Sequence, residues 1–589
     1  MSLAGKESVV DLVVVGAGGA GMAAALFAAI AGLDVLLLER TEFVGGTTAF
    51  SGGTAWVPNT HLAATVGSED SRANAAAFLS RAVGQYGSEE LHHSFLENGP
   101  AAIATLAQHS EVKFRAYPLH PDYMSELDGS TLCGRALEPL PFDGRRLGDG
   151  FTLIRPPIPE FTALGGMMVD RTDIKHLLNF TRSWASFYHA MGLLGRHAKD
   201  RLRHARGTRL VMGNALVARL LCSLRQRRVP VWLRAEVHEL LLQDGRVDGV
   251  RVQHDGGTHR IRARHGVILA SGGFNRHPRL RQELLPSAPT HTPGAPGHTG
   301  AAIELALRAG ARLGNRNLTN AFWAPVSVRQ RPDGSTAVFP HFILDRAKPG
   351  TVIVDHAGRR FVNESTSYHL IGRAMLEAHE RAPTVPAYLI ADARALKAYG
   401  LGMVRPGGRG LKPLLADGYL VRAPTLAELA RKLEIDAAGL TATVTRMNEF
   451  ARTGLDLDFH RGTTAYERNL GDPAAAPNPT MGPIAQAPFY AIRLYPGDIG
   501  ASAGLVTDAQ ARVLTAGDRP LDGLYAVGND MNSIMGGTYP GPGITIGPGL
   551  TFAFIAVQDA ARRAAGTAAD NRRASVPAGP SSVRERQHA

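Results

Sequence analysis

The sequence predicts an α/β protein, in which a parallel sheet built from βαβ units carries an inserted α+β domain. The first unit lies near the N-terminus, where the β-branched run Asp11–Val15 ends at a cluster of glycines. A small-residue helix is predicted over Met22–Ala31 and a second buried strand over Asp34–Leu38. Strands that are apolar almost throughout are typical of a parallel sheet covered on both faces. This pattern accounts for the uncharged stretch 12–33, so no membrane span is predicted there, although its length would suffice to cross a bilayer.

The composition is that of a large globular protein. The chain has 589 residues, of which 44% are hydrophobic and 20% charged, and this excludes a disordered polymer and a coiled coil. The two cysteines, Cys133 and Cys222, are too few for a disulfide framework, a four-thiolate zinc site or an iron–sulfur cluster. We therefore expect free thiols, no metal and a cytoplasmic location. Glu7 and Asp11 also oppose the cationic start of a secretory signal.

The glycine cluster has the spacing of a dinucleotide-binding loop. Residues 16–21 read Gly-Ala-Gly-Gly-Ala-Gly, directly after a predicted strand and at the start of a predicted helix. Gly16 makes the tight turn, Gly18 allows a diphosphate to approach the backbone, and Gly21 lets helix and strand pack closely. Glu39, at the end of the second strand, can accept hydrogen bonds from ribose hydroxyls. The loop, helix and acidic residue together predict a Rossmann-like domain that binds a dinucleotide.

Three further segments resemble the FAD-binding flavoproteins of the fumarate reductase and 3-ketosteroid dehydrogenase type. They are the glycine- and hydroxyl-rich loop 44–53, the strand and glycine turn Gly266–Phe274, and the late strand Leu521–Asn529. A strand pair at Val237–Leu242 and Val247–Val252 resembles the one that reaches the adenine in this family. The resemblance implies FAD as the cofactor. With the glycine loop, it implies these contacts: Gly16, Ala17, Gly18, Gly19, Ala20, Gly21, Glu39, Arg40, Gly45, Gly46, Thr47, Thr48, Ser51, Gly52, Gly53, Val237, Ala270, Ser271, Gly272, Gly528, Asn529, Gly543, Thr545 and Ile546.

This resemblance also implies a division into domains. The FAD-binding domain is expected in two parts, residues 1–285 and 481–566, with a basic insert at 178–230. Residues 286–480 form the inserted α+β substrate or cap domain. Residues 567–589 are rich in Pro, Ser and Arg with almost no large apolar residues, and they are expected to form a disordered tail.

A second set of motifs resembles the 3-ketosteroid Δ1-dehydrogenases over almost the whole chain. They are Pro121–Tyr123, Arg360–Tyr368 and Gly537–Gly549, which contains the run Thr-Tyr-Pro-Gly-Pro-Gly. The resemblance implies that Tyr539 and Gly543 bind the C3 carbonyl of a steroid, that Tyr368 is the base, and that Tyr123 supports it. Phe342 is the expected aromatic residue that lines the steroid slot. On spacing alone each tyrosine could equally be a buried structural residue.

These residue types suit the chemistry of introducing a C1–C2 double bond next to a ketone. The proton on C2 becomes acidic only when the carbonyl oxygen is stabilised as an enolate, and a Tyr O–H with a glycine N–H can do this. A tyrosine can act as the base if a second hydroxyl favours its phenolate. The flavin accepts the hydride. The resemblance further implies a quinone-like electron acceptor.

Other functions stay open at the level of sequence. A fumarate reductase needs arginines and histidines that clamp two carboxylates, and the chain has Thr-Tyr-Pro-Gly-Pro-Gly where such a clamp is expected. The alternatives are a flavin-dependent desaturase or reductase acting on another cyclic ketone, and a membrane-docked flavin electron-transfer protein. The scattered His298, His341, His369 and His460 lack metal-ligand spacing and are interpreted as ordinary residues.

One segment carries most of the net charge. Residues 182–228 contain ten arginines and Lys199 against the single acid Asp200, so this segment contributes +10 to a net charge of +12. Apolar residues are interleaved with the basic ones. The segment is either a solvated basic face or an amphipathic element that contacts anionic lipid, which would place the protein peripherally on the inner face of the cell membrane. No motif for reading nucleic acid accompanies the charge, and no nucleic-acid partner is expected.

Overall fold

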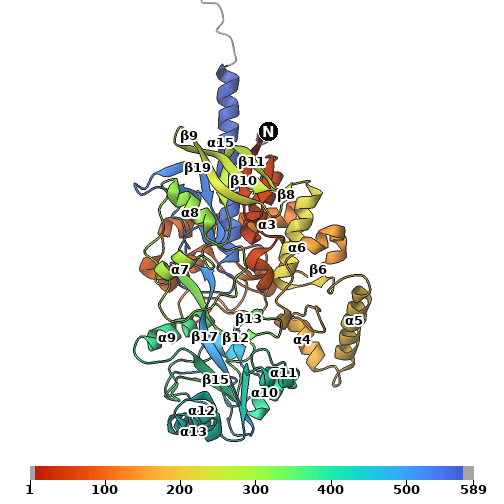
Figure 1. Ribbon diagram of the computed structural model, residues 1–589, viewed down its shortest axis with the longest axis vertical. Coiled ribbons are helices and arrows are strands. Elements are labelled where there is room, and N and C mark those ends of the chain that lie inside the picture. The colour runs from red at the N-terminus through yellow and green to blue at the C-terminus, as the bar shows by residue number, and fades with distance from the viewer. Residues whose placement is uncertain (1–6, 575–589) are drawn as a thin grey trace, which may run out of the picture.

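The structure is a computed structural model that describes residues 7–574 of the chain. It contains two main sheets at opposite ends of the molecule, as Figure 1 shows. The first has eight strands, and its central path runs β18-β19-β11-β1-β2-β8, with β10 and β9 following on from β11. These strands are β1 (Glu7–Val15), β2 (Val35–Leu38), β8 (Val231–Trp232), β9 (Glu236–Gln243), β10 (Arg246–His254), β11 (Gly257–Leu269), β18 (Arg512–Leu514) and β19 (Pro520–Ala526).

The predicted first βαβ unit forms at the centre of this sheet. Helix α1 (Gly19–Ile30) follows β1, and β1 pairs in parallel with both β2 and β11. Leu12, Val13 and Val14 have no exposed surface, as expected for a strand with helices on both faces. The last helix of the described residues, α15 (Ile546–Ala574), packs on α1.

The second sheet is antiparallel and has the strand order β13-β12-β17-β15-β14, with β16 also paired to β17. Its strands are β12 (Ala321–Gln330), β13 (Thr336–Pro340), β14 (Thr351–Val354), β15 (Ala387–Ala391), β16 (Leu420–Ala423) and β17 (Phe489–Ala501). Helices α9 (Tyr368–His379), α10 (Ala393–Tyr399), α11 (Leu411–Ala416), α12 (Leu426–Leu433), α13 (Ala437–Thr453) and α14 (Ala465–Leu470) belong to this part. Because β17 is central to this sheet, the sheet extends past residue 480, where the sequence-based division ended the inserted domain.

Smaller elements complete the fold. One small sheet contains β3 (Ala55–Trp56), β4 (Phe114–Ala116) and β5 (Ala136–Pro139). A second one pairs β6 (Phe142–Asp143) with β7 (Arg209–Leu210). The remaining helices are α2 (Arg72–Val83), α3 (Glu89–His109), α4 (Arg171–Leu178), α5 (Trp184–Arg201), α6 (Met212–Gln226), α7 (Pro278–Leu284) and α8 (Ala301–Arg308).

The basic insert separates into two helices with opposite environments. Helix α6 packs on α1, and its Leu216, Val217 and Leu220 have no exposed surface. Helix α5 lies at the side of the molecule (Figure 1), where Trp184 is 77% and Tyr188 69% exposed. Treating residues 182–228 as one surface element is therefore wrong for α6, whose apolar face is part of the protein core.

The C-terminal prediction is tested only in part. Residues 575–589 of the expected disordered tail lie outside the described residues. Residues 567–574 continue α15, in keeping with the high helix propensity of the alanines that precede Asp570. Within residues 7–574, no helix is both long enough and apolar enough to span a membrane.

Candidate active site

The glycine loop has the backbone geometry of a phosphate-binding turn. Gly16 has φ +106°, and a Cβ there would lie 2.4 Å from the carbonyl oxygen of Ala270. A Cβ on Gly21 would lie 1.8 Å from the carbonyl oxygen of Gly16, so only glycine lets α1 approach β1 this closely. A Cβ on Gly18 would instead meet nothing within 4 Å, which leaves open space at the N-terminus of α1. An anion placed in this space would face the positive end of the helix.

The loop opens onto a cavity at the carboxyl ends of β1 and β2. Of the predicted cofactor residues, its lining includes Gly16, Gly18, Glu39, Arg40, Gly46, Val237, Ala270, Ser271 and Gly272. The Glu39 carboxylate accepts hydrogen bonds from the Ala17 N–H at 2.9 Å and from the Thr41 hydroxyl at 2.7 Å. Its position at the end of β2 is where a ribose hydroxyl would reach it.

A second cavity lies beside the first, at the N-terminus of α15. Gly528, Asn529 and Thr545 line it, together with Phe322 and Phe552. Its Gly528 packs against the first turn of α1, because a Cβ on Gly528 would lie 3.0 Å from the Ala20 methyl. The other predicted cofactor residues line neither cavity, and they are Ala17, Gly19, Ala20, Gly21, Gly45, Thr47, Thr48, Ser51, Gly52, Gly53, Gly543 and Ile546. Some of them support the lining, as where the Gly19 N–H donates to the Thr48 hydroxyl at 3.2 Å.

Two basic residues that the sequence patterns did not identify line the first cavity. Arg155 is 6% exposed, and its Nε has no hydrogen-bond partner among the described residues. His298, interpreted from the sequence as an ordinary residue, packs against Gly272 and Gly46 in the same lining. Burial, together with the Arg155 and Arg276 guanidiniums, lowers the pKa of His298 to about 4. A buried cation with an unpaired donor beside an open glycine loop suits a diphosphate, and so the site fits FAD.

No spacing rule could have found these two residues. Arg155 reaches the cavity from an irregular segment, where its N–H donates to the Val44 carbonyl at 3.0 Å. His298 comes from a stretch between α7 and α8 that contains Gly294, Gly297 and Gly300. Only this local excess of glycine marked the stretch as one that could approach a ligand closely.

Three predicted catalytic tyrosines meet in the interior. Tyr123, Tyr368 and Tyr539 are 7%, 6% and 5% exposed, although they are far apart in the sequence. The Tyr123 hydroxyl donates to the Tyr368 hydroxyl at 3.3 Å. The Tyr539 ring lies 5.2 Å from that of Tyr368 and 5.8 Å from that of Tyr123. Phe342 contacts the same group, with its ring 4.8 Å from that of Tyr368.

Backbone contacts fix the Tyr123 and Tyr539 segments to one another. The Tyr123 N–H donates to the carbonyl of Pro540 at 2.8 Å. The preceding residue, Asp122, accepts hydrogen bonds from the Trp56 indole at 2.7 Å and from the Arg135 guanidinium at 2.8 Å. A Cβ on Gly541 would lie 2.5 Å from the same indole nitrogen, so the Tyr-Pro-Gly turn requires glycine to pack here.

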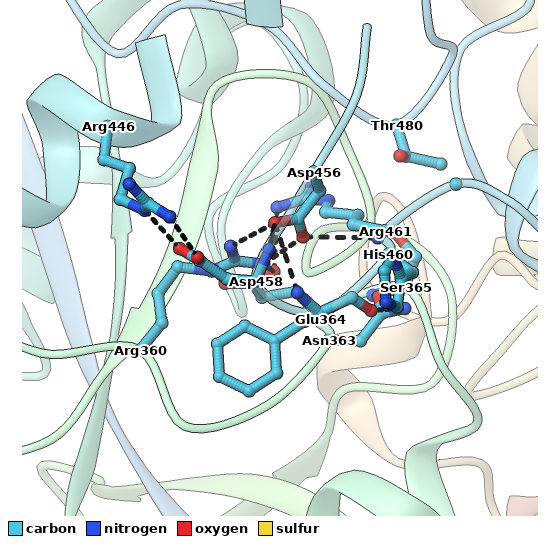
Figure 2. A network of polar contacts seen from close by, with 12 residues as sticks. Arg360, Asn363, Glu364, Ser365, Arg446, Asp456, Asp458, His460, Arg461 and Thr480 are labelled. Carbon is cyan, nitrogen blue, oxygen red and sulfur yellow. Dashed lines mark hydrogen bonds and ion pairs between the residues drawn. The ribbon is translucent and has the colours of Figure 1, made fainter. Parts of the chain in front are cut away.

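The loop that leads to Tyr368 is fixed by buried ion pairs, as Figure 2 shows. Arg360 pairs with Glu364 and with Asp456, both at 2.8 Å, and Arg461 pairs with Glu364 at 3.2 Å. All four side chains are at most 4% exposed. Glu364 stands four positions before Tyr368, the first residue of α9. The ion pairs therefore fix the position of the segment that leads into α9 and so help to position the Tyr368 side chain.

Burial decides the protonation states in the tyrosine cluster. It raises the pKa of Tyr539 to about 12, against the opposing hydrogen bonds to Tyr368 and Thr545. Burial also raises the pKa of Tyr368 and of Tyr123 well above the usual value of 10.0. Tyr539 is therefore a hydrogen-bond donor throughout the neutral range. A base at Tyr368 needs an environment that favours its phenolate.

Gly543 presents its backbone near this cluster. It has φ +91°, and a Cβ there would lie 2.2 Å from the Thr54 carbonyl oxygen. Its carbonyl accepts from the Trp56 N–H at 3.1 Å, whereas its own N–H makes no hydrogen bond to another protein group in residues 7–574. A Tyr539 O–H and an unused N–H are the donors that a developing enolate oxygen needs. In the same residues, no group of three or more His, Cys, Asp or Glu side chains could hold a metal ion.

Comparison with known proteins identifies the family. Residues 11–546 match the profile described as FAD binding domain. The chain is 38% identical over 573 residues to the 3-oxosteroid 1-dehydrogenase of Mycolicibacterium smegmatis, and this alignment covers 94% of the chain and 98% of the relative. The chain belongs to the 3-ketosteroid Δ1-dehydrogenase family.

Other members and neighbours of this family agree with the fold. The crystal structure of the 3-ketosteroid Δ1-dehydrogenase from Sterolibacterium denitrificans, in complex with 1,4-androstadiene-3,17-dione, superposes with a TM-score of 0.88 at 34% identity. It covers 94% of this chain and 100% of that one. A relative named 4-oxocyclohex-2-ene-1-carboxylate 5-dehydrogenase, from Sinomonas cyclohexanicum, is 36% identical over 565 residues, which cover 95% of each chain. Membership of the 3-ketosteroid Δ1-dehydrogenase family confirms the predicted Rossmann-like α/β fold, FAD as cofactor and oxidoreductase activity.

The basic lining of the first cavity gives a prediction about FAD affinity. Arg155→Met removes a charge that can pair with the diphosphate, and a charge-assisted hydrogen bond is worth about 1.5–3 kcal/mol. We expect the dissociation constant of FAD to rise at least about tenfold, measured by flavin fluorescence on adding FAD to the apoprotein. Arg264→Met, at an exposed arginine of β11, is the control. Equal affinity in the two variants would exclude Arg155 from the FAD site.

Proposed function

We propose that the protein oxidises the C1–C2 bond of 3-ketosteroids, converting 3-keto-4-enes to 3-keto-1,4-dienes. The observation that carries this proposal is the meeting of three buried tyrosines, one of which, Tyr539, stands four residues before Gly543, whose N–H makes no hydrogen bond within residues 7–574. Tyr539 and Gly543 bind the ketone oxygen, and Phe342 lines the slot for the apolar ring system. FAD, when bound, supplies the hydride acceptor for C1 and so completes the oxidation.

Within this site, the three tyrosines have different roles in removing the proton from C2. Tyr539 stays protonated because its pKa is about 12, and it donates to the oxygen as negative charge develops there. The Tyr368 oxygen takes the proton from C2. Tyr123 donates to that same oxygen at 3.3 Å, and this hydrogen bond stabilises the phenolate form of Tyr368. Closing the site with aromatic rings excludes water, which strengthens both interactions.

A second candidate substrate has a specific observation in its favour. A relative 36% identical to this chain is named for its action on 4-oxocyclohex-2-ene-1-carboxylate, which is a cyclic ketone with a carboxylate. The same tyrosines could activate that ketone. The aromatic lining by Phe342 and Phe322 favours a larger apolar body. For the electrons we propose a quinone-like acceptor, since one dinucleotide fingerprint is present and FAD takes it.

The substrate proposal is tested by anaerobic mixing of the purified yellow protein with candidate ketones. We expect androst-4-ene-3,17-dione to bleach the flavin and to give the 1,4-diene, identified by mass spectrometry. Bleaching by 4-oxocyclohexanecarboxylate alone would favour the second candidate. If no ketone bleaches the flavin, the protein is an electron-transfer flavoprotein rather than a dehydrogenase. Reoxidation by menadione but not by NAD would support the quinone-like acceptor.

The role of Tyr368 predicts both a variant phenotype and a pH dependence. Because burial raises its pKa, the phenolate fraction grows as pH rises, and flavin reduction should accelerate from pH 7 to pH 10. Tyr368→Phe should retain FAD and lose roughly 10²–10⁴ in the rate of flavin reduction. Tyr388→Phe is the matched control, since Tyr388 is 2% exposed and its hydroxyl donates to Leu433 in another part of the core. Full activity of Tyr368→Phe would remove Tyr368 as the base.

We also propose that α5 contacts anionic lipid. Trp184, Phe187 and Tyr188 form an exposed aromatic group on this helix, with ring centroids 5.8–6.4 Å apart. Arg182, Lys199 and Arg201 are exposed on and beside the same helix. Interfacial helices combine such apolar groups with basic residues. A steroid is poorly soluble in water, and a membrane contact would bring the enzyme to its substrate.

The lipid contact is tested with vesicles containing phosphatidylglycerol. The double variant Trp184→Ser/Tyr188→Ser should bind these vesicles at least about tenfold more weakly in sedimentation, since each buried aromatic contributes about 1.5–3 kcal/mol. Leu457→Ser is the control, because Leu457 is also an exposed apolar residue at 69% exposure but lies in the other part of the molecule. Unchanged vesicle binding of the double variant would contradict the proposal.

A further inference from the structure

Arg346 is a buried arginine that joins two loops of the tyrosine site. Its side chain is completely buried. Nε and Nη2 donate to the carbonyls of His341 and Phe342 at 2.7–3.1 Å. Nη1 donates to the carbonyls of Glu364 and Thr366, both at 2.6 Å. One guanidinium therefore holds the loop that carries Phe342 to the loop that leads directly to Tyr368.

Each of these loops is also held from its other side. His341 Nδ1 bonds to Asp345 at 2.7 Å, and Asp345 also accepts from the Gly402 N–H at 2.8 Å. Glu364 is held by Arg360 and Arg461. The Arg346 guanidinium thus connects two segments that are each anchored to different parts of the inserted domain. Losing it would remove the direct hydrogen bonds between the Phe342 segment and the loop that leads to Tyr368.

The charge of Arg346 has no acidic partner. Among the described residues, no carboxylate lies within 4.0 Å of its guanidinium nitrogens, and the carboxylates of Asp345 and Glu364 are bound to other groups. Dipoles of backbone carbonyls stabilise this buried cation, but its net charge stays +1 in a medium of low dielectric constant. Such a charge favours negative charge on neighbouring groups.

The neighbouring groups are the phenols of the cluster. Burial raises the pKa of Tyr466, the second residue of α14, and the Arg346 guanidinium opposes this rise. The Tyr466 ring packs on Tyr123, with centroids 4.6 Å apart, and Tyr123 donates to Tyr368. The positive charge of Arg346 therefore lies next to a chain of phenols that ends at the base.

We propose that Arg346 is a positioning residue for the dehydrogenation, fixing Tyr368 against Phe342 and stabilising the negative charge that the tyrosine cluster carries when Tyr368 ionises. This inference rests on the proposed function, in which Tyr368 is the base. Arginine is suited to both tasks, because its planar fork bridges several carbonyls and its charge persists at every pH of interest. It would supply the favourable environment that burial alone denies to the phenolate.

The two histidines beside the cluster are neutral in the tested range. Burial lowers the pKa of His120, whose ring is 6.4 Å from Tyr123, and of His369, whose ring is 5.9 Å from Tyr539, to about 3 in both cases. Burial also lowers the pKa of Lys348, two residues after Arg346. Each variant is therefore compared with wild type at the same pH, where Lys348 is present in both.

The test compares the rate of flavin reduction by androst-4-ene-3,17-dione in wild type, Arg346→Gln and Arg346→Lys between pH 6 and pH 10. Gln keeps hydrogen-bond donors without charge. Because the pKa of Tyr368 lies above this range, a rise of about one unit in that pKa should lower the rate about tenfold at every pH from 7 to 10. Lys keeps the charge without the fork, so we expect its rate to fall less than that of the Gln variant at every pH.

Arg219→Gln on α6 is the matched control. Arg219 is 8% exposed and also donates to three backbone carbonyls at 2.6–2.8 Å, but on a helix packed against α1. The rate of flavin reduction by this variant should match that of wild type at every pH. A loss of rate in Arg346→Lys at least as large as that in Arg346→Gln would overturn the electrostatic role. If the Gln variant does not fold, a loss of more than about tenfold in Arg346→Lys overturns it. A wild type that no ketone reduces would refute the proposed function instead.

Discussion

The geometry of the tyrosine site depends on a set of buried charges that neutralise one another. Arg360 and Arg461 face Glu364 and Asp456, two cations against two anions, all at most 4% exposed. The segment they hold contains no helix or strand between Val354 and Tyr368. Ordinary packing cannot hold an irregular loop in one position as firmly as directional ion pairs can in a region of low dielectric constant. Removing one member would leave an uncompensated buried charge, which costs about 3–5 kcal/mol.

The proposed mechanism requires different protonation states of chemically identical groups. In it Tyr539 keeps its proton and Tyr368 loses one, although both are buried phenols with rings 5.2 Å apart. Environment alone can separate them. Tyr539 has Thr545 and the motif glycines beside it, whereas Tyr368 has the Tyr123 hydroxyl and, beyond it, Tyr466 and the charge of Arg346. This asymmetry is the physical basis of a division into donor and base.

Features set by short spacings could be predicted from the sequence. The glycine loop, the βαβ unit and the strand pair before Val252 all formed where the patterns placed them, since each depends on neighbours in the chain. Tyr123, Tyr368 and Tyr539 were identified as catalytic candidates by their resemblance to family motifs. Periodicity alone could not have selected these three from the 13 tyrosines in the chain.

Features set by long-range packing could not be predicted. Residues 212–226 and 184–201 look alike in composition, yet only the first meets α1 and becomes core. Arg155, His298 and Arg346 lie on irregular segments whose neighbours come from elsewhere in the chain. A contact between residues far apart in sequence leaves no local signal.

The first turn of α1 meets the first turn of α15 at Ala20, whose methyl would lie 3.3 Å from a Cβ on Gly549, a residue that lines the second cavity. The helices that contribute to the cofactor site thus come from the two ends of the described chain. A dinucleotide that contacts both would act as a cross-link between them and would stabilise the folded state in proportion to the logarithm of its concentration. The supply of FAD would then influence the lifetime of each copy of the protein as well as its rate of turnover.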